Sequence, residues 1–187
     1  MNIHKDIQEA VSHLKNGGTI LYPTDTIWGL GCDATNEAAI EKIFAIKHRP
    51  KEKNLIVLMD SVGMLKHYVN ISAEIEELIS SFDVPTTVIY SNPKHFPTSV
   101  VTSVHTVAIR ITSHEFCKAL ISAFGKPIIS TSANISGENH PVYFEDIAEE
   151  IKNNVDHIVS NEYDTSEYKQ PSRLIKILPD NTLDFLR

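Results

Sequence analysis

Apolar residues recur three or four positions apart in several segments, which is the spacing of a helix with one buried face. In the first of these segments Ile7, Ala10, Val11 and Leu14 share a face, and Gly17-Gly18 marks the end of the helix. The other predicted helices span residues 36–47, 62–68, 72–82, 115–124 and 144–153.

Short apolar runs between these helices predict strands. They span residues 19–22, 55–59, 86–90, 107–112, 127–130, 158–159 and 173–178. The run from Leu55 to Met59 is apolar throughout, which is typical of a central strand covered on both faces. Residues 92–103 and 161–170 are rich in polar residues or proline and predict loops.

The order of these elements predicts an α/β (α+β) fold with one twisted mixed sheet flanked by helices. Strands 86–90 and 107–112 follow each other without a helix between them, which is evidence against a fully parallel sheet. A length of 187 residues fits a single domain, spanning residues 1–187, with a sizeable core.

The chain is acidic, with a formal net charge of −7, whereas a dedicated duplex-binding protein would usually be basic. No apolar run approaches the ~20 residues of a membrane span, and the first residues lack the apolar core of a signal peptide. We therefore expect a cytoplasmic protein without membrane contact. Cys32 and Cys117 make neither a disulfide framework nor a zinc pattern, and no metal site is predicted.

Three polar clusters interrupt this ordinary pattern. The first is Pro23-Thr24-Asp25-Thr26-Ile27-Trp28-Gly29-Leu30-Gly31, which follows a strand-like run. Its short oxygen-bearing side chains stand near the end of that strand, where ligands bind open α/β sheets. Its glycines permit close approaches that a side chain would forbid. The alternative is a structural turn whose hydroxyls bond to its own backbone.

The second cluster, Lys47-His48-Arg49-Pro50-Lys51-Glu52-Lys53, concentrates positive charge in an acidic chain. Arginine holds phosphate oxygens through a planar fork, and lysine supplies a point charge. A solvated basic loop at the end of a helix is the alternative. The position of the cluster just before a buried strand favours a phosphate site.

The third cluster is Ser130-Thr131-Ser132-Ala133-Asn134-Ile135-Ser136-Gly137. An extended segment would direct Ser130, Ser132 and Asn134 to one side, although such a run can also be a simple polar turn. The chain contains no P-loop, no G-x-G-x-x-G and no G-x-S-x-G motif, so a nucleotide would bind outside those standard cradles.

Arg110 follows the apolar run Val107-Ala108-Ile109, so its head group leaves a buried strand and needs an anion. That anion can be a ligand carboxylate or a carboxylate on a helix of the protein itself.

The segment from Tyr22 to Ala34 resembles the opening signature of the YrdC family. Lys47-x-Arg49 followed by Leu55-Ile56-Val57 resembles the K-x-R segment of that family, and residues 132–137 resemble its S-x-N segment. The three motifs stand in the order of the family, and the similarity runs from about residue 17 to residue 178. The resemblance implies a YrdC-like sheet with a concave binding face.

The resemblance also implies L-threonylcarbamoyladenylate synthase activity, which is a nucleotidyltransferase reaction. L-threonine, bicarbonate and ATP would give threonylcarbamoyl-AMP and pyrophosphate, and Mg²⁺ would arrive with the ATP. Downstream tRNA threonylcarbamoyl transferase proteins would use the product to modify tRNA.

Roles for individual residues follow from the same resemblance. Lys47 and Arg49 would be the catalytic residues and would face the ATP phosphates. The further ATP-binding residues would be Lys53, Thr106, Ser132 and Asn134. The L-threonine-binding residues would be Thr26, Arg110, Ser130 and Ser172. Separately, a preference for threonine over serine would need an apolar contact to the threonine methyl group, from Trp28 or a nearby aliphatic side chain, although Trp28 can also be a core residue.

The chain departs from the family pattern in several places. Lys53-Asn54 stands where asparagine and proline are common, Leu58 replaces a histidine of some members, and a P-G-P segment is reduced to Val84-Pro85-Thr86-Thr87. Leu178-Pro179-Asp180 stands where R-P-G is usual, which predicts the loss of one arginine contact to ATP.

Two other functions stay open at this point. One is an RNA-binding module with a concave basic face, against which the acidic total charge is evidence, although a weak RNA contact fits a role in tRNA modification. The other is a YrdC-like paralogue that acts on another small acid or carbamoyl substrate, because Thr26, Arg110 and Ser130 would also hold other small acids.

Overall fold

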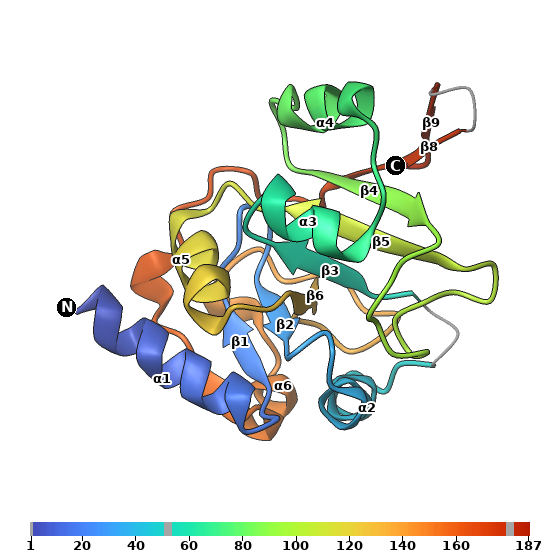
Figure 1. Cartoon of the computed structure of the whole chain (residues 1–187). Coiled ribbons are helices and arrows are strands. Elements are labelled where there is room, and N and C mark those ends of the chain that lie inside the picture. Colours follow the sequence, from blue (N-terminus) through green and yellow to red (C-terminus); the bar gives the residue numbers. More distant parts are fainter. Residues whose placement is uncertain (1, 51–53, 179–181) are drawn as a thin grey trace.

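The computed structural model describes residues 2–50, 54–178 and 182–187 of the chain. Within these residues, one mixed sheet has the strand order β7-β1-β2-β6-β3-β5-β4-β8-β9 and is flanked by helices, as the sequence predicted (Figure 1). Its strands are β1 (Ile20–Tyr22), β2 (Gly29–Gly31), β3 (Ile56–Met59), β4 (Thr86–Ser91), β5 (Thr106–Ile111), β6 (Ile128–Ser132), β7 (His157–Ile158), β8 (Arg173–Ile177) and β9 (Leu183–Phe185).

The α-helices begin and end where local signals place them. They are α1 (Ile3–Lys15), α2 (Glu37–Ile46), α3 (Val62–Tyr68), α4 (Ala73–Ser80), α5 (Glu115–Phe124) and α6 (Glu149–Asn154). Asn2, Asn36, Ser61 and Ser72 are N-caps whose side chains accept hydrogen bonds from first-turn backbone N–H groups. Gly125 ends α5 in the left-handed conformation, with φ 79°.

The helices cover the two faces of the sheet unequally. On one face, α2, α3 and α4 pack on Val57, Met59 and Ile109. On the other face, α1 and α5 lie side by side and cover Leu58 and Ile128 (Figure 1). Side chains alternate along a strand, so Ile56 lies on the same face of the sheet as Leu58. At Ile56 this face extends beyond the part that α1 and α5 cover.

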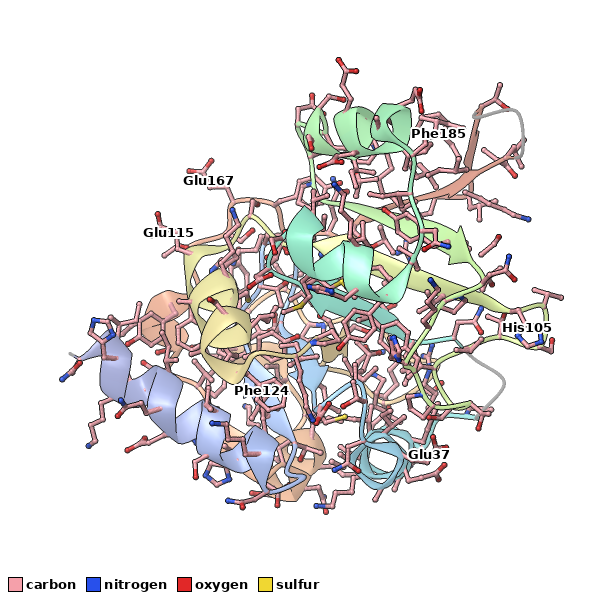
Figure 2. All side chains as sticks on the ribbon, in the orientation of Figure 1. Glu37, His105, Glu115, Phe124, Glu167 and Phe185 are labelled. Carbon is pink, nitrogen blue, oxygen red and sulfur yellow. The ribbon has the colours of Figure 1, made fainter. Side chains whose placement is uncertain are left out.

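Charged side chains on the rim of the molecule point outward. Glu37 at the start of α2, Glu115 at the start of α5 and Glu167 in the loop before β8 are all exposed (Figure 2). Among the described residues, no helix combines the length and apolar character that crossing a membrane requires.

The predicted helix 144–153 is wrong as one element. A 3-10 turn, Phe144–Asp146, precedes α6, and Ile147 between them is extended with φ −69° and ψ 126°. Ile147 is 2% exposed and packs in one apolar cluster with Trp28, so burial of this side chain outweighs continuation of the helix.

The sequence pattern did not predict two of the strands, and a third strand is longer than predicted. The short segments β2 and β9 are held by pairing with their neighbours rather than by strong strand propensity. In β2, a Cβ on Gly31 would lie 2.3 Å from the carbonyl oxygen of Ile129, so only glycine allows the two strands to approach this closely. The β6 strand continues to Ser132, into the third polar cluster.

Candidate functional site

A cavity of about 370 Å³ lies on the face of the sheet that extends beyond α1 and α5. Its floor is one row of neighbouring residues from four adjacent strands, namely Ser130, Ile56, Ala108 and Ile89. The sheet register therefore brings together side chains that are far apart in the sequence. An aliphatic floor with a hydroxyl at one end suits a small ligand with both apolar and polar groups.

Most of the predicted site residues line this cavity. They are Thr26, Arg49, Arg110, Ser130, Ser132, Asn134 and Ser172. They come from all three polar clusters, from β5 and from the residue that precedes β8. A cavity lined by hydroxyls and guanidinium groups therefore lies where the resemblance implied a concave face.

The hydroxyls of Thr26 and Ser172 are fixed by neighbouring hydroxyls. Thr24 and Thr26 have their Oγ1 atoms 3.0 Å apart, and Thr24 Oγ1 also donates to the carbonyl oxygen of Ile27 at 2.8 Å. Ser172 Oγ lies 2.7 Å from Thr87 Oγ1. The first cluster is thus a self-bonded turn, and this turn directs Thr26 into the cavity lining.

Arg110 is paired with a carboxylate of the protein, but this carboxylate, Asp25, lies between β1 and β2 and not on a helix as the alternative expected. The Nη2 atom of Arg110 lies 3.1 Å from Oδ1 of Asp25, and the two side chains are only 4% and 6% exposed. Asp25 Oδ2 accepts a hydrogen bond from the backbone N–H of Ser113 at 3.2 Å. The Nε atom of Arg110 is buried without a hydrogen-bonding partner among the described residues. Arg110 is therefore charge-compensated while part of its donor capacity is unused.

Asn134 holds the turn of the third cluster and also leaves an atom unsatisfied. Its Nδ2 group donates to the carbonyl oxygens of Ile135 at 2.9 Å and Glu138 at 2.8 Å. Its Oδ1 is buried, and no donor for it occurs in the described part of the chain. An unsatisfied acceptor beside a cavity suits a ligand N–H or O–H group, which a small side-chain movement would bring into reach.

Lys47 joins the second cluster to the third. Its ammonium group donates to the carbonyl oxygens of Ser132 and Asn134, and its own carbonyl accepts from the N–H of Ser136. The side chain is 1% exposed. Burial, together with the nearby charge of Arg49, lowers the pKa of Lys47 to about 7.

We expect wild type to gain stability relative to Lys47→Met as the pH rises above about 7. The pKa of Lys47 is about 7 in the folded protein against an ordinary 10.5, so above pH 7 the unfolded chain binds more protons. Raising the pH then favours the folded state, by up to ~1.4 kcal/mol per pH unit. Urea unfolding at successive pH values measures this difference, with Lys15→Met on the exposed face of α1 as the control. A pH-independent difference between wild type and Lys47→Met would contradict the expectation.

Two predicted residues, Lys47 and Thr106, do not line the cavity, and a third prediction falls on a residue that the structure does not describe. Lys47 lies behind the third cluster, as just described. Thr106 shares the face of Ala108 and Arg110 on β5, but its Oγ1 lies 2.7 Å from Oγ1 of Thr102. Lys53 lies outside the described residues. The roles of all the predicted site residues, these three included, stay predictions.

Sequence reasoning missed Glu138, His140 and Arg187, which also line the cavity. Glu138 and His140 come just after the third cluster, and this position in the sequence could have identified them as candidates for the site. Arg187 Nε donates to the carbonyl oxygen of Ser172 at 3.2 Å, and its backbone pairs with Leu174. An arginine from the C-terminal segment therefore reaches the cavity although Leu178-Pro179-Asp180 contains none.

The arrangement can neutralise a polyanion and hold a small polar molecule beside it. Arg49 and Arg187 supply planar donor groups that suit phosphate oxygens. Thr26, Ser130 and Ser172 add hydroxyls to the same cavity as Arg110, a combination that suits a carboxylate. Nothing in this arrangement requires a nucleophilic side chain, so its chemistry is positioning and electrostatic stabilisation.

Comparison with known proteins identifies the family of this chain. The sequence profile of the Sua5/YciO/YrdC family, described as "Telomere recombination", matches residues 12–187. A protein of Pseudoalteromonas translucida named threonylcarbamoyl-AMP synthase is 40% identical over 144 residues, 74% of this chain and 76% of the relative. A Vibrio cholerae protein of the same name is 34% identical over 178 residues, 93% of this chain and 94% of the relative.

A solved structure shares the fold. P. abyssi Sua5 complexed with L-threonine superposes with a TM-score of 0.86 at 28% sequence identity, and the match covers 100% of this chain. This chain spans 54% of the length of that Sua5 chain, a little over half.

Proposed function

This chain belongs to the Sua5/YciO/YrdC family, and on that basis we propose that it is an L-threonylcarbamoyladenylate synthase. The observation that carries the proposal is the convergence of three separate sequence motifs on one cavity. Residues from the opening signature, the K-x-R segment and the S-x-N segment all line it, together with Arg110 and Ser172.

L-threonine would occupy the part of the cavity around Arg110. Thr26, Ser130 and Ser172 line the same cavity with hydroxyls, and the threonine carboxylate would accept a hydrogen bond from the unpaired Nε of Arg110. ATP would occupy the part bounded by Arg49 and Arg187, with Ser132 and Asn134 beside it. Lys47, Lys53 and Thr106 would complete the nucleotide contacts.

The reaction joins three substrates in two steps. The amine of threonine forms a bond to the carbon of bicarbonate, and water leaves, which gives a carbamate. A carbamate oxygen then bonds to the α-phosphorus of ATP while the bond to the bridging oxygen breaks and pyrophosphate leaves. The guanidinium groups would stabilise the charge that develops on the leaving phosphates.

Other partners follow from this reaction. Mg²⁺ would be carried by the triphosphate, because this ion prefers phosphate oxygens with one or two carboxylates. The mixed anhydride product is reactive, so a tRNA threonylcarbamoyl transferase would consume it, and the reaction would take place in the cytoplasm.

Pyrophosphate release from ATP tests the proposal, with threonine and bicarbonate each omitted in turn. We expect release only when both are present, and threonylcarbamoyl-AMP in the reaction mixture by mass spectrometry. Release that is indifferent to threonine would overturn the substrate assignment. Salt-sensitive binding of RNA with no turnover of ATP would instead identify an RNA-binding module.

We expect a limited preference for threonine over serine. The two amino acids differ by one methyl group, and an apolar contact discriminates such a pair by only ~1–3 kcal/mol. Ile56, Ile89 and Leu174 offer aliphatic contacts in the cavity, and Trp28 also lines it although its side chain belongs to the apolar core. Competition with serine and with 2-aminobutyrate measures the preference. Equal use of serine and threonine would remove the methyl contact from the proposal.

A further inference from the structure

Asp25 stands behind Arg110 rather than beside a cavity ligand. Arg110 lines the first cavity, whereas Asp25 is absent from that lining and instead lines a second cavity of about 260 Å³ at α3 and α4. Thr26, the next residue, lines the first cavity. The turn of the first cluster thus directs two neighbouring side chains to opposite sides, one toward the ligand and one toward the back of Arg110.

Asp25 and Arg110 form an ion pair, but each side chain keeps an atom without a hydrogen-bonding partner among the described residues. Asp25 Oδ1 and Arg110 Nη2 are 3.1 Å apart, yet Oδ1 has no aligned donor among the described residues. The N–H of Ser113 holds Asp25 Oδ2, so the carboxylate is anchored to the segment between β5 and α5. Arg110 in turn keeps its unpaired Nε donor.

We propose that Asp25 is a positioning residue that holds the Arg110 guanidinium in the orientation that receives the ligand carboxylate. This inference rests on the proposed function and names a residue to which the resemblance assigned no role. A buried guanidinium without a counter-charge would turn toward whatever carbonyl or hydroxyl acceptor it reached. With Asp25 behind it, the guanidinium is already placed when threonine arrives, and little ordering is left to the binding step.

The test compares Asp25→Asn with wild type by steady-state kinetics and by calorimetry with L-threonine. We expect the KM and Kd for threonine to rise at least about tenfold, because a charged contact is lost. We expect the KM for ATP to stay within about twofold, since Asp25 does not line the cavity. Asp25→Glu restores the charge and should recover part of the threonine affinity.

Two controls separate positioning from general destabilisation. Asp33 is also buried, at 5% exposure, and pairs with Lys126 away from the cavity, so Asp33→Asn should lower thermal stability without changing threonine affinity. In an Arg110→Lys background, Asp25→Asn should cost less than about threefold in threonine affinity, since the residue it positions is gone.

The outcomes distinguish this inference from the proposed function. Equal effects of Asp25→Asn in the wild-type and Arg110→Lys backgrounds would overturn the positioning role. The positioning role would also be overturned if Asp25→Asn and Asp25→Glu both bound threonine with wild-type affinity. Failure of wild type itself to bind threonine would overturn the proposed function instead.

Discussion

Arg49→Ala is expected to lower kcat/KM for ATP roughly 10- to 150-fold, with threonine affinity close to that of wild type. The range corresponds to the ~1.5–3 kcal/mol that one charged hydrogen-bonding partner contributes. Arg49 lines the cavity, its Nη2 donates to the carbonyl oxygen of Asn54 at 2.7 Å, and its own N–H donates to Phe44. The guanidinium is thereby held between α2 and β3, where it can meet a phosphate without large rearrangement.

Pyrophosphate-release kinetics at varied ATP concentration measure this effect. Lys176→Gln is the matched control, because Lys176 is an exposed cation on β8 that does not line the cavity. We expect that control to behave like wild type. If Arg49→Ala keeps the wild-type kcat/KM for ATP, the phosphate role of the second cluster is wrong.

Arg110→Lys is expected to weaken threonine binding to a similar extent, roughly 10- to 150-fold, while affecting the KM for ATP much less. Lysine keeps the positive charge near Asp25 but loses the planar fork and the Nε donor, so it cannot hold a carboxylate and Asp25 in the same way. Calorimetry with L-threonine measures the loss directly.

A second variant at this position tests the ion pair. Arg110→Met would leave Asp25 as a buried carboxylate without its counter-ion, which should cost about 3–5 kcal/mol of folding free energy. Urea unfolding should therefore show Arg110→Met to be far less stable than Arg110→Lys. If Arg110→Lys binds threonine with wild-type affinity, another residue holds the threonine carboxylate.

Much of the fold could be predicted because its signals are local. The α3 helix spans the predicted residues 62–68, and α5 spans the predicted 115–124. Caps such as Ser72 and Gly125 act on the backbone within a few residues, so a single sequence contains the information needed to place them. The apolar run before Arg110 likewise predicted a buried cation that needs an anion.

The elements that sequence reasoning missed depend on distant partners. The β2 strand is short and contains two glycines, and it exists because β1 and β6 pair with it on either side. The break between the 3-10 turn and α6 comes from the burial of Ile147 beside Trp28, which no local pattern encodes. Arg187 reaches the cavity because β9 turns back along β8.

The α/β class, most of the helices and strands, and the residue types that line the proposed site could be predicted from the sequence alone. Which side chains meet became visible only in the folded chain: Asp25 pairs with Arg110, Lys47 donates to the backbone carbonyls of the third cluster, and Arg187 lines the cavity. The physical reason is that caps and apolar periodicity act within a few residues. Ion pairs and cavity walls instead depend on strand register and on contacts between segments that lie far apart in the sequence, such as Ile56 and Ser130 or Asp25 and Ser113.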